Sequence, residues 1–472
     1  MSNQECDLGL IGLGTMGRNF VLNMADHGTA VAVYNRTAEK TREFLAQEVG
    51  SRPIRAGYAL PDFVGLLQPP RAIILLVAAG DPVDAVIKEL LPLMAAGDLI
   101  IDGGNSHFTD TNRRAKILAS KGLNFIGMGI SGGEQGARYG PSLMPGGPRE
   151  AYERVAPIME AAAAKVNGEP CVTYLGPGSS GHYVKMVHNG IEYGVIELLA
   201  ESYDLLKRGL GLKPEELAEV YDRWNSSELN SFLLEITARI FRRADERTGQ
   251  PLVNVILDKA RQKGTGMWTS WDAMDLQVPT PTIDVAVVLR GLSGHKEQRL
   301  AAARVLKGPQ KAIALNQEQF LARLQNALYA AIITTYAQGL ALLKKASETY
   351  AYDLNLEAVV RIWRGGCIIR ASLLEEIRQA YVATPDLANL LLDPHLGRAF
   401  MDRQKDLREV VKAAIDLGLP AAGLAVSLAY FDAYRSAQLP ANLIQAQRDF
   451  FGAHTYERLD LPGTFHTAWE EE

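Results

Sequence analysis

The sequence predicts a doubly wound α/β domain, a large all-α domain after it, and a short C-terminal tail. In the first third of the chain, short segments rich in Ile, Leu and Val alternate with amphipathic segments, which is typical of parallel strands covered on both faces. Beyond about residue 180 this pattern ends and long periodic apolar segments follow. We therefore expect three parts, at residues 1–179, 180–437 and 438–472.

The first part has five expected strands, at residues 8–13, 30–35, 72–77, 99–102 and 124–128. Their short length and the helical segments between them predict a parallel sheet. The glycine-rich segment 176–181 follows and predicts a hinge.

Helices are expected throughout the second part, for example at residues 185–207, 321–345 and 357–381. Two of these segments resemble each other at a constant shift, and Trp224 and Trp363 follow them at nearly the same offset. This similarity indicates an internal helical duplication. From about residue 439, prolines and aromatic residues without clear periodicity predict a tail.

Composition limits the kinds of partner and compartment. With a net charge of -5 over 472 residues, the chain does not carry the basic surface of a protein that binds nucleic acid or anionic membranes. Its cysteines Cys6, Cys171 and Cys367 are far apart, which indicates reduced thiols and not a disulfide or zinc framework. We expect no metal site. The start of the chain has no signal-peptide pattern, and apolar runs such as 72–79 are too short to span a membrane, so we expect a soluble cytoplasmic protein.

A glycine motif follows the first expected strand and begins a helix. Its members are Gly12, Leu13, Gly14, Thr15, Met16 and Gly17. Gly12 permits the tight turn, Gly14 lets the backbone approach a pyrophosphate, and Gly17 lets helix and strand pack closely. The helix N-terminus then stabilises the negative charge of the ligand. The motif therefore predicts a Rossmann-type dinucleotide-binding domain.

The end of the second expected strand distinguishes NAD from NADP. NAD-binding sites place an acidic residue there to hold the ribose hydroxyl, whereas this chain has Asn35, Arg36 and Thr37 and no acid. Because a guanidinium and a hydroxyl suit a 2′-phosphate, the sequence predicts NADP. The alternative is that Arg36 is an ordinary surface residue.

A polar stripe runs along one expected helix directly after the hinge. It consists of Lys185, His188, Asn189, Glu192 and Tyr193. This spacing places all five on one face of a helix. A solvated face is the alternative interpretation, but the duplicated segment has Ala322 and Tyr329 at the positions of Lys185 and Glu192, so the helices do not require the polar pair. If both groups are buried, their pKa values move toward neutrality and they can act as base and acid.

Two loops have the composition of anion sites. Ser131, Gly132 and Gly133 combine a hydroxyl with bare backbone amides at the end of a strand. A second loop, Lys263-Gly264-Thr265-Gly266, pairs one cation with a hydroxyl and free amides. Further basic groups are Arg290 and, in the tail, Arg448 and His454. Taken singly, the first loop is explained equally well by a glycine-rich turn, and each of the basic groups is better explained as a surface charge than as a ligand.

Taken together, these segments resemble the decarboxylating 6-phosphogluconate dehydrogenase family along essentially the whole chain. The resemblance extends over residues 12–17, 35–37, 102–106, 128–147, 184–194, 263–268, 362–370 and 443–456. It implies an NADP-dependent, metal-independent reaction in which Lys185 takes the proton of the C3 hydroxyl while hydride passes to NADP. Loss of CO2 follows, Lys185 returns a proton to the enediolate oxygen, and Glu192 protonates C1 to give ribulose 5-phosphate.

The resemblance also implies a role for each remaining residue of the site. The cofactor would contact the glycine motif, residues 35–37, Val77, Ala78, Ala79 and Asn105. The sugar-acid part of 6-phosphogluconate would contact Asn105, Ser131, Gly132, Gly133, His188, Asn189 and Glu192. The phosphate would contact Tyr193, Lys263, Thr265 and Arg290. Arg448 and His454 match residues that the family delivers from a partner subunit, which implies a homodimer.

The chain departs from the family pattern at three positions. Ala78 stands where many relatives have Lys, which puts cofactor contacts there in doubt. Arg261 replaces a small residue, and Met267 replaces a basic one. None of these changes removes a proposed catalytic group.

Two other functions remain open at this stage. A β-hydroxyacid dehydrogenase for a smaller substrate shares the glycine motif, the 131–133 loop, Lys185 and Asn189, but such enzymes are much shorter and lack the 263–266 loop and the tail. A non-catalytic NADP-binding protein would not need both Lys185 and Glu192. A turnover assay separates these cases.

Overall fold

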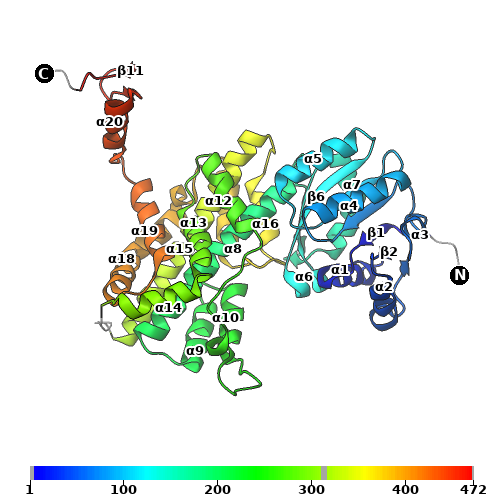
Figure 1. Cartoon of the computed structure of the whole chain (residues 1–472), viewed down its shortest axis with the longest axis horizontal. Helices are drawn as coiled ribbons and strands as arrows, with labels where there is room; N and C mark the ends of the chain where they lie inside the picture. Colours follow the sequence, from blue (N-terminus) through cyan, green and yellow to red (C-terminus); the bar gives the residue numbers. More distant parts are fainter. Residues whose placement is uncertain (1–4, 310–315, 470–472) are drawn as a thin grey trace.

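The computed structural model describes residues 5–309 and 316–469. An α/β lobe and a helical lobe lie side by side, and the C-terminal segment projects away from the helical lobe (Figure 1). The predicted combination of a Rossmann-type domain, an all-α domain and a tail is confirmed.

The α/β lobe is built on one seven-stranded sheet with the order β3-β2-β1-β4-β5-β6-β7. Its strands are β1 (Leu8–Ile11), β2 (Val31–Tyr34), β3 (Ile54–Ala56), β4 (Ala72–Leu75), β5 (Leu99–Asp102), β6 (Asn124–Ser131) and β7 (Ser142–Gly146). The first six strands run parallel, and β7 pairs with β6 in the antiparallel direction. Strands β3 and β7 were not expected from the sequence, and β6 runs three residues further than predicted.

Helices cover both faces of this sheet, and strand residues alternate between two apolar cores. Ile74 packs in the core with α1 and α7, whereas Ile73 and Leu75 pack in the core with α3, α4 and α5. The helices are α1 (Thr15–Asp26), α2 (Ala38–Phe44), α3 (Leu60–Val64), α4 (Asp81–Leu90), α5 (Phe108–Ala119), α6 (Gly133–Tyr139) and α7 (Arg149–Ala162). Burial on both faces explains why the strands read as continuous apolar segments.

Two long helices form the centre of the second lobe: α8 (Ser180–Asp204) and α15 (Gln317–Tyr350), which pack against each other. They are surrounded by α9 (Pro214–Asn225), α10 (Phe232–Arg242), α11 (Leu252–Val255), α12 (Thr265–Asp275), α13 (Pro281–Ser293), α14 (Lys296–Val305), α16 (Leu356–Trp363), α17 (Leu373–Ala383), α18 (Pro394–Leu417) and α19 (Ala422–Tyr434). By length and apolar composition α15 alone among the described helices could cross a membrane, but 89% of that apolar window is buried inside the protein.

The predicted helix at 357–381 is wrong, because the chain forms two helices there. Helix α16 ends at Trp363, α17 begins at Leu373, and Gly366 between them adopts a φ of 65° that a helix does not allow. Trp224 and Trp363 are both fully buried and lie in the helices that follow α8 and α15, an order of elements that fits the predicted duplication.

The tail contains its own small set of elements: α20 (Ala441–Gly452), β10 (Tyr456–Glu457) and β11 (Thr464–Phe465), the two strands forming an antiparallel hairpin. Large apolar side chains such as Leu443, Ile444, Phe450 and Phe451 are more than half exposed on it. A surface of this kind is typical of a contact region.

A buried carboxylate joins α8 to the start of α19. The first helical N–H groups of α19 have no side-chain cap, because Ala421 occupies the capping position. Glu201 of α8, only 3% exposed, accepts hydrogen bonds from the N–H groups of Gly423 at 2.6 Å and Leu424 at 2.9 Å. A carboxylate from a distant helix thus does what a local cap normally does.

We expect Glu201→Ala to lower the free energy of unfolding by about 2–4 kcal/mol, because it leaves two buried N–H groups without an acceptor. Denaturant unfolding of the variant against the wild type checks this. Glu235→Ala, an exposed carboxylate on α10, serves as the control, with an expected change below about 0.5 kcal/mol. Equal stabilities for wild type and Glu201→Ala would contradict the capping role.

Candidate active site

The glycine motif forms the turn between β1 and α1 as the sequence predicts. Gly12 has a φ of 109°, and a Cβ there would collide with the carbonyl oxygen of Leu76, while a Cβ at Gly17 would collide with the carbonyl oxygen of Gly12. Gly14 has open space around it. The N–H of Leu13 donates to Oδ1 of Asn35 at 3.1 Å, so the glycine turn and the end of β2 are joined.

A pocket of about 480 Å³ lies at the carboxyl ends of β1, β2 and β4. Its walls include Gly12, Asn35, Arg36, Thr37, Val77 and Ala78 among the predicted cofactor residues. Arg36 and Thr37 are exposed at its edge. The sequence analysis missed Lys40, which lines the same pocket one turn further along α2. The signal in the sequence was that Lys40 is a second basic residue, three positions after Thr37. Residues three positions apart lie on the same face of a helix. This pocket fits the phosphorylated ribose of NADP.

Three residues of the polar stripe of α8, Lys185, His188 and Asn189, form one hydrogen-bonded set. Lys185, a buried residue (6% exposed), donates through its amine to Oδ1 of the half-buried Asn189 at 2.8 Å, and Asn189 donates to Oγ1 of Thr265 on α12 at 3.1 Å. Nδ1 of His188 lies 3.0 Å from the same Oδ1, and its Nε2 lies 3.3 Å from Oγ of Ser131. Because a carbonyl oxygen can only accept, Nδ1 donates and Nε2 accepts from the Ser131 hydroxyl.

Burial moves Lys185, His188 and Glu192 of this stripe toward their neutral forms. It lowers the pKa of Lys185, against the opposing charge of Glu192. It raises the pKa of Glu192, against the opposing charges of Lys185 and Arg290. For His188, burial and the charge of Lys185 together hold the pKa well below its usual value. Lys185 and Glu192 therefore act on each other electrostatically in one environment, as a base and an acid of one site would.

Strand β6 forms the wall opposite α8. At Gly129 a Cβ would collide with the Cβ and Cγ of Lys185, so the absence of a side chain there lets the strand contact the lysine directly. Sequence reasoning did not identify this position. Gly132 and Gly133 follow with φ of 111° and 60°, and nothing lies within 4 Å of a Cβ at Gly133. Bare amides at an open left-handed turn are the backbone geometry that the predicted anion site requires.

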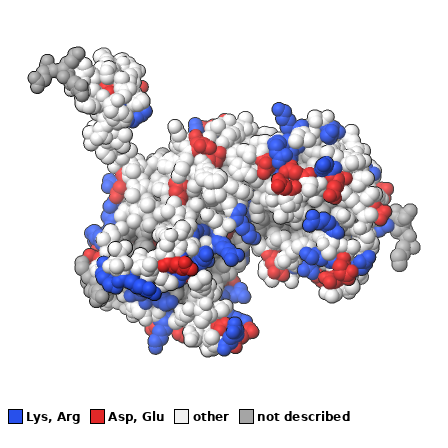
Figure 2. Space-filling model, in the orientation of Figure 1, with Lys and Arg blue, Asp and Glu red and all other residues white. Residues whose placement is uncertain are grey.

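The predicted phosphate residues gather at the start of α12 and on α13. The Arg290 guanidinium lies 3.4 Å from the centre of the Tyr193 ring, and Gly266 leaves room for that ring. Thr265 is buried, whereas Lys263 is exposed on the preceding loop. Of the two nearby residues that depart from the family pattern, Arg261 is exposed and Met267 is partly exposed. Figure 2 shows basic side chains over the α12–α13 region beside the junction of the two lobes. Basic side chains are thus grouped in this region although the net charge of the chain is -5.

Asn105 is exposed on the loop after β5. Asp102 at the end of the strand accepts from Oγ of Ser106 at 2.6 Å, which holds the loop. Two residues after Asn105, the ring of His107 contacts that of Trp268 edge-on at 5.0 Å. The β5 loop of one lobe therefore lies beside the Lys263–Thr265 loop of the other. The other predicted cofactor residues do not line the pocket at the end of β2; they are Leu13, Gly14, Thr15, Met16, Gly17, Ala79 and Asn105.

Arg448 and His454 are not brought to this site within one chain. Both are exposed on the tail, which projects from the far side of the helical lobe (Figure 1). Among residues 5–309 and 316–469 there is also no cluster of three His, Cys, Asp or Glu side chains that could hold a metal ion.

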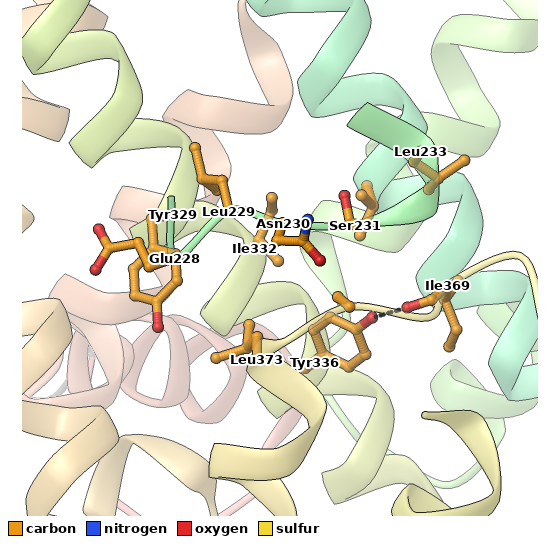
Figure 3. Close-up of a pocket in the computed structure, with 12 residues that line it drawn as sticks. Glu228, Leu229, Asn230, Ser231, Leu233, Tyr329, Ile332, Tyr336, Ile369 and Leu373 are labelled. Atoms are coloured by element: carbon orange, nitrogen blue, oxygen red, sulfur yellow. Dashed lines mark hydrogen bonds between the residues drawn. The ribbon is translucent and has the colours of Figure 1, made fainter. Parts of the chain in front are cut away.

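The duplicated helix carries no second site. Tyr329, which aligns with Glu192, lines a cavity of only about 20 Å³ together with Tyr336, whose hydroxyl donates to the carbonyl oxygen of Ile369 at 2.8 Å (Figure 3). A volume of this size accommodates about one water molecule and no sugar. The pairing of a lysine with a glutamic acid is thus specific to α8, since α15 has Ala322 and Tyr329 at these positions.

Comparison with known proteins extends over both lobes. Residues 7–176 match the family described as the NAD binding domain of 6-phosphogluconate dehydrogenase, and residues 181–469 match 6-phosphogluconate dehydrogenase, C-terminal domain. A decarboxylating 6-phosphogluconate dehydrogenase of Synechococcus elongatus is 55% identical over 464 residues, 98% of each chain. The NADP(+)-dependent, decarboxylating enzyme of Bacillus subtilis is 52% identical over 470 residues, 99% of this chain and 100% of that one.

Among solved structures, 6-phosphogluconate dehydrogenase of Plasmodium falciparum, studied in apo form and in complexes with NADP+ and 6-phosphogluconate, matches with a TM-score of 0.95 and 44% identity, over 98% of this chain and 100% of that one. The similarity includes the helical lobe and the tail. The chain therefore belongs to the 6-phosphogluconate dehydrogenase family.

Proposed function

We propose that the protein catalyses the NADP-dependent oxidative decarboxylation of 6-phospho-D-gluconate to D-ribulose 5-phosphate, CO2 and NADPH, a reaction of the pentose phosphate pathway and of gluconate utilization. The observation that carries this proposal is that Lys185 and Glu192 lie on one face of α8, where burial lowers the pKa of the lysine and raises that of the glutamic acid. The named relatives, which match over nearly the whole chain, support the same reaction.

NADP would bind along the glycine turn, with its 2′-phosphate at Arg36 and Thr37, and when bound it supplies the acceptor for the C3 hydride. The open space at Gly14 and the pocket at the end of β2 fit this ligand. The remaining cofactor contacts in the proposal are Leu13, Thr15, Met16, Gly17, Asn35, Val77, Ala78, Ala79 and Asn105.

In this proposal the neutral amine of Lys185 accepts the proton of the C3 hydroxyl as the hydride leaves. The resulting 3-keto acid loses CO2, and the protonated amine returns a proton to the enediolate oxygen. Glu192 then protonates C1 while Lys185 takes the hydroxyl proton back, which yields the ketone. The hydrogen bond to Asn189 fixes the direction of the amine through all three steps.

Substrate would lie between β6 and α8. Its carboxylate and hydroxyls would contact Asn105, Ser131, Gly132, Gly133, His188, Asn189 and Glu192. Its phosphate would contact Tyr193, Lys263, Thr265 and Arg290. Because the guanidinium of Arg290 rests on the Tyr193 ring, it is held in place before the phosphate binds, which lowers the entropic cost of binding.

The proposal includes a homodimer in which Arg448 and His454 of one chain complete the phosphate site of the other. Their exposure on a projecting, partly apolar tail supports this arrangement. It also retains the division into residues 1–179, 180–437 and 438–472, and a cytoplasmic location, which the three free cysteines favour.

A substrate comparison tests the proposed reaction. The purified chain with NADP should turn over 6-phosphogluconate, and should act at least about a hundredfold less efficiently on gluconate, which lacks the group that the phosphate residues bind. A short β-hydroxy acid should not react. Comparable turnover of a short β-hydroxy acid would favour the smaller-substrate enzyme, and no turnover of any substrate would favour a non-catalytic NADP-binding protein.

We expect Arg36→Ala to raise the KM for NADP by roughly 10- to 100-fold and to leave the KM for NAD nearly unchanged, because one charge-assisted contact to the 2′-phosphate is lost. Steady-state kinetics with both cofactors measures this. Arg42→Ala is the matched control, since Arg42 lies on α2 and pairs with Glu39 outside the pocket. Equal effects on NADP and NAD would show that another residue recognises the 2′-phosphate.

A further inference from the structure

A carboxylate is buried at the centre of the tail. Asp449 of α20 is fully buried, although the segment that carries it projects away from the rest of the chain (Figure 1). Its Oδ1 accepts from the N–H of Thr455 and from Nδ1 of His466, both at 2.9 Å. Its Oδ2 accepts from the N–H of Thr467 at 3.1 Å and from Nε1 of Trp469 at 2.8 Å.

These four donors belong to the two segments that follow α20. Thr455 lies in the turn just after the helix, and the other three donors lie after strand β11. Burial alone would raise the pKa of Asp449, but the hydrogen bonds of His466, Thr467, Trp469 and Thr455 lower it to about 2. Asp449 is therefore ionised, and four hydrogen bonds from other groups of the tail replace the water that its carboxylate loses on burial.

The turn that Asp449 holds carries His454. Ala453 and Thr455, on either side of His454, adopt φ of 49° and 61°. Left-handed backbone is strained at residues with a side chain, so it persists only when other contacts hold it. The hydrogen bond from the Thr455 N–H to Asp449 is such a contact.

Arg448 is joined to the same turn by a second side chain. Gln445 accepts from the Arg448 guanidinium at 3.0 Å and donates to the carbonyl oxygen of Thr455 at 2.5 Å. Arg448 immediately precedes Asp449 on α20, and His454 immediately precedes Thr455. The two exposed basic residues are thus held at a set spacing by Asp449 and Gln445.

We propose that Asp449 is the positioning residue of the tail: its carboxylate folds residues 441–469 into a unit that presents Arg448 and His454 together to the substrate site of a second copy of this chain. This inference rests on the proposed role of the tail. The exposed apolar residues Phe450 and Phe451 lie between Arg448 and His454 in the sequence, and the ring of Phe451 contacts that of His454 edge-on at 6.1 Å, so the apolar surface that a second copy would cover adjoins the basic pair.

Asp449→Asn keeps the size of the side chain but directs an NH2 group at two of the four donors. We expect the KM for 6-phosphogluconate to rise at least about tenfold, with the KM for NADP unchanged, because only the phosphate side of the site loses its contacts. Asp460→Asn is the matched control: Asp460 is an exposed tail carboxylate paired with Arg458, and its removal should change neither constant. Gln445→Ala should give a smaller change of the same kind.

Mixed dimers test whether the defect acts in trans. Subunits with Asp449→Asn and subunits with Lys185→Met, co-expressed and isolated through two different tags, should together show wild-type KM for 6-phosphogluconate at one site per dimer. At that site the Asp449→Asn subunit supplies Lys185 and the Lys185→Met subunit supplies an intact tail. If each tail served the site of its own chain, no site in the mixed dimer would have both an intact Lys185 and an intact tail. Because each parent is impaired alone, recovery in the mixed dimer also excludes a general folding defect.

The outcomes separate the two levels of the proposal. If Arg448→Ala raises the KM for 6-phosphogluconate while Asp449→Asn and Gln445→Ala do not, the tail acts as proposed but Asp449 does not position it. If Arg448→Ala and His454→Ala also leave that KM unchanged, the role of the tail itself is wrong. If Asp449→Asn fails to fold, an unchanged KM in Gln445→Ala overturns the inference.

Discussion

Lys185→Met is expected to bind both ligands and to form NADPH more slowly than the wild type by about 10²- to 10⁴-fold, because the proposed base for the C3 hydroxyl is removed. Methionine keeps the length and the apolar packing of the buried stem, so the contact with Gly129 on β6 is retained. Rapid mixing with 6-phosphogluconate and NADP measures hydride transfer, and calorimetric titration measures binding.

The control for this variant is Lys207→Met. Lys207 follows α8 and contacts Tyr203 and Asn254 at the far end of the helix, so its removal should leave the rate unchanged. The pH dependence gives a second readout. Since the base must be unprotonated, the wild-type rate should fall as the pH drops through the lowered pKa of Lys185. NADPH formation near the wild-type rate in Lys185→Met would exclude this lysine as the base.

Glu192→Gln is expected to separate the first half of the reaction from the last. Its amide cannot protonate C1, so steady-state turnover should fall by about 10²- to 10⁴-fold. Lys185 is intact, and hydride transfer and loss of CO2 precede that step. The first turnover should therefore still give a burst of NADPH and CO2 equal to the number of sites.

Glu197→Gln is a matched control, because Glu197 lies five residues further along α8, on another side of the helix, and burial also raises its pKa. It should keep the wild-type steady-state rate. The absence of a burst in Glu192→Gln would mean that Glu192 acts before or during hydride transfer. An unchanged steady state would mean that another group protonates C1.

The central strands were predictable because both faces of the sheet are buried. Strands β1, β2, β4 and β5 read as continuous apolar segments and form where expected. Strand β3 has only three residues, and its middle residue is exposed. Strand β7 ends in Pro145 and Gly146, which local propensity excludes from strands. It forms because β6 offers a free edge, and that pairing is a tertiary effect.

Helical periodicity predicted which residues of α8 share a face, and the absence of an acid after β2 predicted the cofactor. Neither pattern gives contacts between segments far apart in the chain. The direct contact of Gly129 with Lys185, and the four donors around Asp449, depend on how distant elements pack. Lys40 was missed because α2 was not predicted to begin at Ala38, and it is this start that places Lys40 on the pocket wall.

The central claim is that a neutral Lys185 and a protonated Glu192 act on one sugar acid in one site. Simultaneous recording of NADPH absorbance and released CO2, after the purified chain is mixed with 6-phosphogluconate and NADP, tests it most directly. The account predicts one CO2 for each NADPH, with hydride transfer first in time. NADPH formed without CO2, or no NADPH at all, would contradict it.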